Sequence, residues 1–282
     1  MLFIENNNLT KILSTTKQPI EVMGILNITP DSFSDGGKYT QIDVALKQVE
    51  NMIEAGASII DIGGESTRPG AAEVPAKTEI ARVIPLLKAI KQRFNIKVSI
   101  DTSKASVMAE AIEHQADIIN DVRALQNKGC VAVMAQTDLP ICLMHMQGLP
   151  RTMQKAPQYT NLVDDIHIFF EERISLCNSQ GINTNRLILD PGFGFGKTLQ
   201  QNYELLAQLS TFKKFKLPLL AGLSRKSMIG DLLNRKVTER LAGSLATALI
   251  AAQQGANILR VHDVKETVDA LRILSTVNKF KN

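Results

Sequence analysis

The sequence predicts a (β/α)8 barrel, and three observations support this fold class. Short apolar runs recur eight times along the 282 residues, each rich in Ile, Val and Leu. They are apolar on both faces, as the buried strands of a parallel sheet are. Segments with the apolar spacing of amphipathic helices separate them, and most runs end in a polar residue. One domain over residues 1–282 accommodates this pattern, with a doubly wound open sheet as the alternative architecture.

The apolar runs predict eight strands, and their ends predict a site. In chain order they are VMGILN to Asn27, SIIDIGG with Asp61, KVSID to Asp101, DIIND with Asn120, PICLMH to His145, RLILD to Asp190, LPLLAG to Gly222 and NILRVH to His262. Catalytic groups of such barrels lie at the carboxyl ends of the strands. Seven of these runs carry a polar side chain there, which indicates a binding site rather than seven separate helix caps.

Helical spacing is clearest in four of the intervening segments: 43–55, 79–94, 162–177 and 237–253. In the first, the predicted apolar stripe consists of Val44, Leu46, Val49, Met52 and Ile53. A strand followed by such a helix, repeated along the chain, is the pattern of an α/β barrel with its helices outside.

Composition excludes several classes of function. The net charge of +4 is too small for a nucleic-acid-binding surface, and no apolar run is long enough to span a membrane. The N-terminus carries Glu5 and three asparagines where a signal peptide needs a continuous apolar segment. The three cysteines, Cys130, Cys142 and Cys177, form no metal-binding spacing. We therefore expect a cytoplasmic protein that acts on small molecules, with reduced cysteines in its core.

The stretch LILDPGFGFGKT, residues 187–198, resembles a nucleotide-binding loop. Pro191 replaces the first glycine of that pattern and has no N–H to offer a phosphate, and Asp190 would repel one. A nucleotide hydrolase would depend on Lys197. The glycines instead favour close approach of the backbone to a flat ring, which Phe193 or Phe195 could cover.

The polar groups at the strand ends separate by charge. Asp101, Asn120 and Asp190 form an acidic, amide-rich side. Asn27, Arg68, Lys226, Arg260 and His262 form an anion-binding side, and residues 224–227, Ser-Arg-Lys-Ser, would begin a helix whose N-terminus favours an anion. Carboxylates bind an N–H/NH2 edge such as that of a 2-aminopyrimidinone ring. The predicted ligand therefore has a guanidine-like head and a phosphorylated tail.

With these residues in place, the sequence resembles the bacterial dihydropteroate synthase family over about residues 21–278. The motifs that carry the resemblance are GILNITPDSFSDGG, IIDIGGESTRPGA, SIDTSKASV, IINDV, LMHMQG, LDPGFGFGK, AGLSRKSMIG and RVHDV. They occur in the family's order, one at each predicted strand. The resemblance implies the joining of (7,8-dihydropterin-6-yl)methyl diphosphate to 4-aminobenzoate, with release of pyrophosphate, in a homodimer formed through C-terminal helices.

The resemblance also implies roles for individual residues. The pterin would be bound by Asp101, Asn120, Val122, Met144, Asp190, Phe195, Gly222, Lys226 and Arg260. The diphosphate would be held by Asn27, Thr67, Arg68, Arg260 and His262, with Asn27 also a ligand of Mg²⁺. The 4-aminobenzoate would lie against Phe33, Thr67, Arg68, Pro69 and Ser224, which implies sensitivity to sulfonamides. The catalytic groups would be Lys226, Arg260, His262, Asp101 and Asp190.

The chemistry expected of this layout is an SN1-like loss of pyrophosphate, because an electron-rich pterin stabilises a methylene cation. Preplaced cations and Mg²⁺ would stabilise the departing charge. Two alternatives share the acidic ring-binding side: a pterin-binding methyltransferase, which would not need Lys226, Arg260 and His262 together, and a non-catalytic pterin-binding paralogue.

Overall fold

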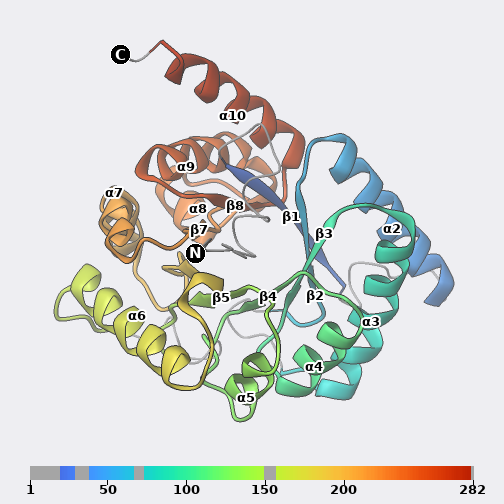
Figure 1. Cartoon of the computed structure of the whole chain (residues 1–282). Helices are drawn as coiled ribbons and strands as arrows, with labels where there is room; N and C mark the ends of the chain where they lie inside the picture. Colours follow the sequence, from blue (N-terminus) through green and yellow to red (C-terminus); the bar gives the residue numbers. More distant parts are fainter. Residues whose placement is uncertain (1–19, 29–37, 67–72, 149–156, 281–282) are drawn as a thin grey trace, which may run out of the picture.

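Eight parallel strands form the centre of the molecule (Figure 1). The computed structural model describes residues 20–28, 38–66, 73–148 and 157–280. The strands are β1 (Glu21–Asn27), β2 (Ile59–Gly63), β3 (Lys97–Asp101), β4 (Ile118–Asp121), β5 (Ile141–Met144), β6 (Leu187–Asp190), β7 (Leu220–Ala221) and β8 (Ile258–Val261). Each matches one of the eight apolar runs, so the number and order of the predicted strands are confirmed.

The sheet closes on itself. Its order is β6-β5-β4-β3-β2-β1-β8-β7, so the first strand pairs with the last. A parallel bridge between Leu189 and Leu219 joins β6 to β7, and the N–H of Leu189 donates to the Pro218 carbonyl at 2.9 Å. The barrel prediction is therefore confirmed, and the open doubly wound sheet is wrong.

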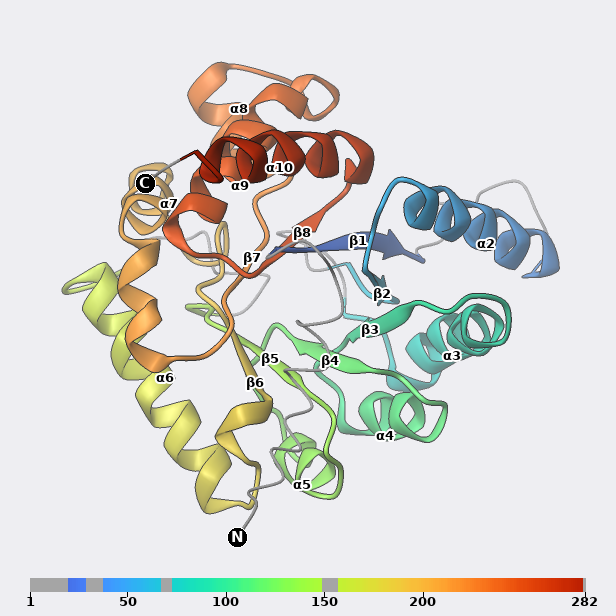
Figure 2. The same ribbon diagram turned by 45° about the horizontal axis from the view of Figure 1, so that its top comes forward.

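Helices surround the strands (Figures 1 and 2). The described α-helices are α2 (Lys38–Glu54), α3 (Ala76–Arg93), α4 (Ala105–Glu113), α5 (Cys130–Ala135), α6 (Leu162–Ser179), α7 (Leu199–Ala207), α8 (Ser227–Leu233), α9 (Leu241–Gln254) and α10 (Val264–Asn278). Short 3-10 turns at Thr184–Arg186, Leu209–Phe215 and Val237–Glu239 complete the connections. The β7–β8 connection thus carries two helices where the strand–helix pattern requires one.

The alternation of side chains along the strands places the site on the inside of the barrel. One buried cluster takes a single residue from each of seven strands: Met23, Ile59, Ile118, Cys142, Ile188, Leu220 and Ile258. Two positions further along these strands, and so on the same face, stand Ile25, Asp61, Asn120, Met144, Asp190, Gly222 and Arg260. Asp101 follows buried Ser99 in β3 by the same interval. A polar layer therefore lies directly above an apolar one.

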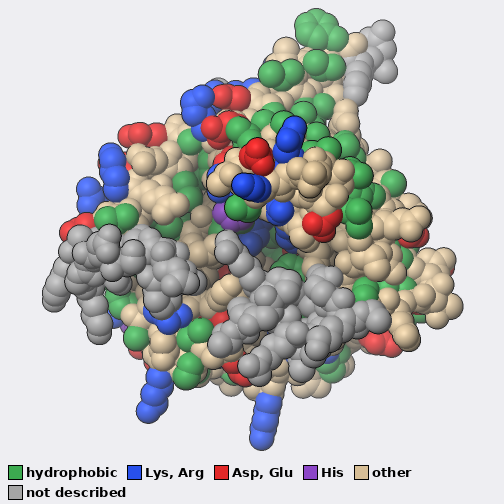
Figure 3. All heavy atoms as spheres, turned by 180° about the vertical axis from the view of Figure 1, so that it is seen from behind, with side chains coloured by type: hydrophobic (Ala, Val, Ile, Leu, Met, Phe, Trp, Pro, Cys, Tyr) green, Lys and Arg blue, Asp and Glu red, His purple; other side chains and the backbone are tan. Residues whose placement is uncertain are grey.

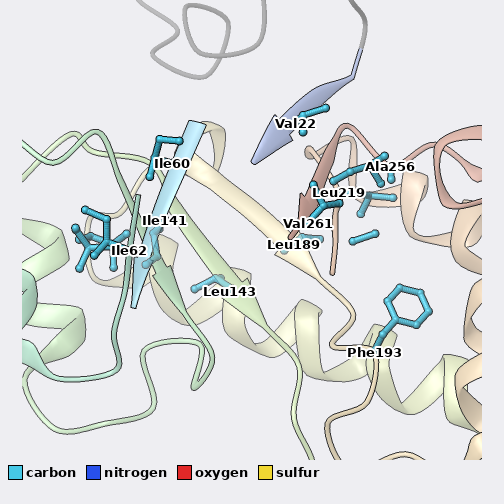
Figure 4. Close-up of a cluster of buried hydrophobic side chains, with 14 of the residues drawn as sticks. Val22, Ile60, Ile62, Ile141, Leu143, Leu189, Phe193, Leu219, Ala256 and Val261 are labelled. Atoms are coloured by element: carbon cyan, nitrogen blue, oxygen red, sulfur yellow. The ribbon is translucent and has the colours of Figure 1, made fainter. Parts of the chain in front are cut away.

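The opposite faces of the strands pack against the helices and form the larger core. Figure 4 shows part of this cluster, with Ile60 and Ile62 on one side of the view and the Phe193 ring on the other. Glycine at position 24 allows α2 to approach β1, because a Cβ there would lie 2.8 Å from the sulfur of Met52. The strands are therefore apolar on both faces because one face packs inside the barrel and the other packs against the helices.

Two details of the predicted helices are wrong. Val44 is 52% exposed, and the buried stripe of α2 instead contains Ala45 beside Leu46, Val49 and Met52. Helix α9 begins at Leu241 rather than at 237, because Val237–Glu239 form a separate 3-10 turn before it.

The cysteines confirm their predicted place: Cys130, Cys142 and Cys177 are all buried and free. Among the helices that the structure describes, none combines the length and the apolar run that crossing a bilayer requires.

Candidate active site

Arg260 lies at the centre of the polar layer and joins two buried carboxylates. Its Nε donates to Asp61 Oδ2 at 2.6 Å, and its terminal nitrogen donates to Asp101 Oδ2 at 2.8 Å. Asn120 donates to the same oxygen of Asp61 at 3.2 Å. Strands β2, β3, β4 and β8 are thereby tied together at one level. Arg260 thus contacts the acidic side, although the charges of the strand ends alone assigned it to the anion-binding side.

Asp61 is a residue of the site that the sequence analysis gave no role. It was counted among the polar side chains that end the apolar runs but was given no binding role, yet it is fully buried and bonded to both Arg260 and Asn120. Because its partner Arg260 is 199 residues away, no local motif assigns Asp61 a role. Its position in the inward series of β2 is the signal that would have identified it.

The electrostatic balance of the layer favours electron-poor N–H groups. Burial, opposed by Arg260 and reinforced by Asp61, raises the pKa of Asp101 to about 7. Burial also raises the pKa of Asp190, against the attraction of Lys226. Burial lowers the pKa of Lys226 to about 8, although Asp190 opposes the shift. The layer contains three carboxyl side chains, Asp61, Asp101 and Asp190, and two basic ones, Lys226 and Arg260. It therefore has more hydrogen-bond acceptors than its own cations use, and these acceptors can bind the N–H groups of a ligand.

Lys226 reaches the same layer from the β7–α8 turn. Its ammonium donates to the carbonyl of Phe193 and lies 4.7 Å from the centroid of the Phe195 ring. Arg225 has a φ of +58°, a left-handed conformation that non-glycine residues seldom adopt. Ser244 Oγ accepts from its N–H at 2.9 Å, and Arg240 donates to its carbonyl at 3.0 Å. These bonds hold the strained turn that aims Lys226 inward.

The structure does not support the predicted anion site at the start of α8. Arg225 is paired with Asp263 through its Nε, at 3.0 Å, so its charge is already compensated. Lys226 faces the polar layer inside the barrel, where Asp190, Phe193 and Phe195 lie. The two cations of that segment therefore serve different neighbours, because the left-handed Arg225 directs them apart.

His262 and Ser224 lie together on the side that the sequence assigned to the anion. The N–H of His262 donates to Ser224 Oγ at 3.2 Å, and His262 Nδ1 lies 3.1 Å from the same oxygen. A hydroxyl that accepts from the backbone and donates to Nδ1 favours the tautomer with its proton on Nε2.

Asn27 and Gly222 lie at the carboxyl ends of β1 and β7. Asn27 is exposed at the end of β1, and its Oδ1 lies 3.3 Å from the point where a Cβ on Gly63 would stand. A Cβ on Gly222 would lie 3.8 Å from Arg260 Cβ and 3.9 Å from Lys226 Nζ. Glycine at 222 therefore keeps open the space between the two cations.

The loop at 190–198, which we name the ring-binding turn after its predicted role, is not built as a phosphate loop. Asp190 Oδ1 accepts from the N–H of Gly192 at 2.8 Å. Lys197 is 2% exposed, and its ammonium contacts the carbonyls of Gly192 and Phe195 and the Nδ1 of His145. Since Lys197 points into its own loop, the nucleotide alternative that depends on it is contradicted.

Acidic and basic residues hold the described parts of the connection between β2 and α3. Glu65 accepts from the N–H of Val74 at 2.9 Å and pairs with Lys104. Lys104 also pairs with Glu79 at 2.5 Å, and Glu79 is fully buried. No local motif indicates this cluster, because its members lie up to 39 residues apart in the sequence. It holds the chain on both sides of residues 67–72.

Most of the predicted site residues come together at the carboxyl ends of the strands. The buried ones are Asp101, Asn120, Val122, Met144, Asp190, Gly222 and Ser224, with Phe195, Lys226, Arg260 and His262 half-buried and Asn27 exposed. Phe33, Thr67, Arg68 and Pro69 lie outside the described residues, so their predicted roles stay predictions. Figure 3 shows blue basic side chains and a purple histidine gathered beside a hollow near the middle of one face.

A parallel barrel with a buried acid–base layer at its rim defines a class of ring-binding enzymes. Known proteins of similar sequence and structure belong to this class. The family model described as pterin binding enzyme matches residues 23–262. Dihydropteroate synthase of Escherichia coli K12 is 58% identical over 260 residues, which cover 92% of each chain. That of Haemophilus influenzae is 54% identical over 253 residues, covering 90% of this chain and 92% of its own.

Solved structures lead to the same family. The structure of Yersinia pestis dihydropteroate synthase with a sulfonamide drug has a TM-score of 0.88 at 55% identity, covering 92% of this chain and 94% of its own. Xanthomonas albilineans dihydropteroate synthase with 4-aminobenzoic acid has a TM-score of 0.88 at 46% identity, covering 93% and 94%. The chain therefore belongs to the dihydropteroate synthase family of pterin-binding enzymes.

Proposed function

We propose that the chain is a dihydropteroate synthase, which condenses (7,8-dihydropterin-6-yl)methyl diphosphate with 4-aminobenzoate to give 7,8-dihydropteroate and pyrophosphate. The observation that carries the proposal is the polar layer of the barrel, in which buried Asp101, Asn120 and Asp190 stand beside Lys226 and Arg260. The family and the close relatives agree with it.

The pterin would lie on this layer with its N–H/NH2 edge toward the carboxylates. Asp190 and Asp101 accept hydrogen bonds, and Asn120 can both donate and accept. Lys226 would donate to the acceptor side of the ring. Met144, Val122 and Phe195 would cover the ring faces, and Gly222 would leave space for it. Arg260 would contact the ring from its place between Asp61 and Asp101.

The diphosphate would lie on the side of Asn27 and His262, together with Thr67, Arg68 and Arg260. Within the described ranges, no group of three His, Cys, Asp or Glu side chains is arranged to hold a metal ion. The exposed carboxamide oxygen of Asn27 fits Mg²⁺ as a single protein ligand, since Mg²⁺ keeps most of its waters and takes further oxygens from phosphates. When bound, Mg²⁺ would stabilise the negative charge on the departing pyrophosphate.

The 4-aminobenzoate would approach from the side of Ser224, with Phe33, Thr67, Arg68 and Pro69. In the proposed SN1-like step the methylene C–O bond breaks first, and its electron pair leaves with pyrophosphate. The arylamine nitrogen then attacks the methylene carbon and loses its proton. Asp101 and Asp190 stabilise the positive charge that the pterin carries between the two events. A secondary deuterium isotope effect near unity at the methylene would contradict this order of events.

The test is pyrophosphate release from the dihydropterin diphosphate with Mg²⁺, measured with and without 4-aminobenzoate. Release that needs the amine and yields dihydropteroate would confirm the proposed reaction. Tight pterin binding without amine-dependent release would point to the methyltransferase or to the non-catalytic paralogue. Because the structure of the Yersinia pestis relative is a sulfonamide complex, we also expect sulfonamides to compete with 4-aminobenzoate here.

The proposed assembly is a homodimer through the C-terminal helices. Apolar side chains are exposed on α9 and α10, among them Ile250 at 42%, Ile273 at 68% and Val277 at 51%. Apolar surface of this kind marks contacts with other proteins. The proposed location is the cytoplasm, because a diphosphate substrate does not cross membranes unaided.

A further inference from the structure

The ring-binding turn has an internal support that the proposed reaction does not use. Lys197 is almost completely buried, and the three groups that its ammonium contacts are uncharged: the Gly192 carbonyl at 2.8 Å, His145 Nδ1 at 3.0 Å and the Phe195 carbonyl at 3.2 Å. Three acceptors match the three N–H bonds of an ammonium. Burial lowers the pKa of Lys197 to about 7, although Asp190 opposes the shift. Burying an ammonium that no carboxylate contacts is costly, and an apolar side chain would fill this space more cheaply. A basic group here therefore needs a reason.

The direction of the carbonyl groups supplies the reason. Lys197 binds the carbonyls of Gly192 and Phe195, whereas the carbonyl of Phe193, between them, accepts from Lys226 on the ring side. Lys197 thus holds one side of the turn while Lys226 holds the other. The same turn presents the Phe195 ring to Lys226 and the Gly192 N–H to Asp190.

The turn also packs tightly against the segment that follows β5. Gly192 and Gly196 have φ values of +73° and +63°, and an added Cβ would come 1.9 Å from the His145 carbonyl oxygen and 2.5 Å from that of Gln147. His145 itself donates from its backbone to the Asp190 carbonyl at 2.8 Å. Its ring packs edge-on against Phe169. The position of His145, the side-chain partner of Lys197, is therefore fixed by contacts other than the one with Lys197.

We propose that Lys197 is a positioning residue for the pterin ring: by holding the Gly192 and Phe195 carbonyls against His145, it fixes the turn that presents Asp190, Phe195 and the Phe193 carbonyl to Lys226 and the ring. This inference deepens the proposed function and rests on it. Lys197 touches no substrate in this arrangement, so its effect is on ring binding and not on the bond that breaks.

The experiment compares Lys197→Met, which removes the three donors, with Lys197→Gln, which keeps two. Lys214→Met is the matched control, because Lys214 lies on the surface in an exposed pair with Glu171. Binding of pterin is measured by calorimetry at a temperature where each variant is folded by circular dichroism. Steady-state KM values for both substrates are measured alongside.

We expect Lys197→Met to weaken pterin binding and to raise the KM for the dihydropterin diphosphate about tenfold, which corresponds to about 1.4 kcal/mol. The KM for the arylamine substrate stays unchanged, Lys197→Gln recovers part of the loss, and Lys214→Met matches the parent. Unchanged pterin affinity in folded Lys197→Met would overturn the inference. So would a failure of both Lys197 variants to fold, since Lys197 would then support the barrel as a whole.

The parent protein separates this inference from the function it rests on. If the parent binds pterin but makes no dihydropteroate, the proposed reaction falls, and the pterin affinities still test Lys197. If the parent makes dihydropteroate and Lys197→Met binds pterin normally, only the inference falls.

Discussion

At the scale of single residues, the site depends on buried charges that compensate one another across strands. Asp61 and Asp101 bind different nitrogens of Arg260, and Asp190 lies near Lys226. Removing one member of such a set leaves its partner buried and short of a charge, which costs more than the pair contributes. Single substitutions here should therefore alter the ligand's surroundings as well as stability.

We expect Asp61→Asn to lower kcat/KM for the dihydropterin diphosphate about tenfold, or ~1.4 kcal/mol. The amide keeps the shape and can accept from Arg260 Nε, but it no longer balances the guanidinium charge. The KM for the arylamine substrate should not change. Asp269→Asn, in an exposed pair with Lys265, is the control and should behave as the parent. Equal kinetics in Asp61→Asn and the parent would show that Arg260 needs only one carboxylate.

Pterin affinity should fall as the pH rises through about 8. Burial lowers the pKa of Lys226 to about 8, so the ammonium that would donate to the ring is present below this pH and lost above it. Titration calorimetry from pH 7.5 to pH 9.5, above the pKa of about 7 of Asp101 and Lys197, measures the effect. In Lys226→Arg the side chain stays charged throughout, so its affinity should not fall over this range. If the pterin affinity of Lys226→Arg still decreases at alkaline pH, the group that titrates is on the ligand and not Lys226.

At the scale of elements, the strands were predictable and the details of their connections were not. Burial on both faces of the barrel strands leaves a local pattern, the apolar run, in the sequence. The role of Asp61 was missed because its partner Arg260 is 199 residues away in the sequence. Arg225 pairs with Asp263 because of a left-handed turn, which no motif announces.

One connection offers a test of backbone strain. Gln115 follows α4 with a φ of +64° and is exposed, so its side chain contributes strain and little packing. We expect Gln115→Gly to raise the free energy of unfolding by about 1 kcal/mol, because glycine adopts this conformation freely. Urea denaturation provides the measurement. Glu113→Gly, in the last turn of the same helix, should lower it by roughly 0.5–1 kcal/mol. A loss of stability in both variants would contradict the strain argument.

At the scale of the whole molecule, the barrel exposes apolar side chains on its C-terminal helices. Ile273 and Val277 lie on α10, the last helix, which projects from the barrel in Figure 1. If this face joins two copies, then Ile273→Glu combined with Val277→Glu should shift the protein from dimer to monomer in sedimentation, since charges would be buried without partners. Val44→Glu, on exposed α2, is the control and should leave the mass unchanged. A parent that sediments as a monomer would contradict the proposed assembly.

The pairing of the first strand with the last has a consequence for synthesis on the ribosome. Arg260 comes from β8, so the carboxylates of β2 and β3 have no cation between them until residue 260 has emerged. Before that, β1 also presents an unpaired edge to other nascent chains. Chaperones that act on nascent chains would therefore bind the incomplete barrel. A message truncated before codon 258 would yield a product that lacks β8, so its barrel would not close and it would not bind pterin.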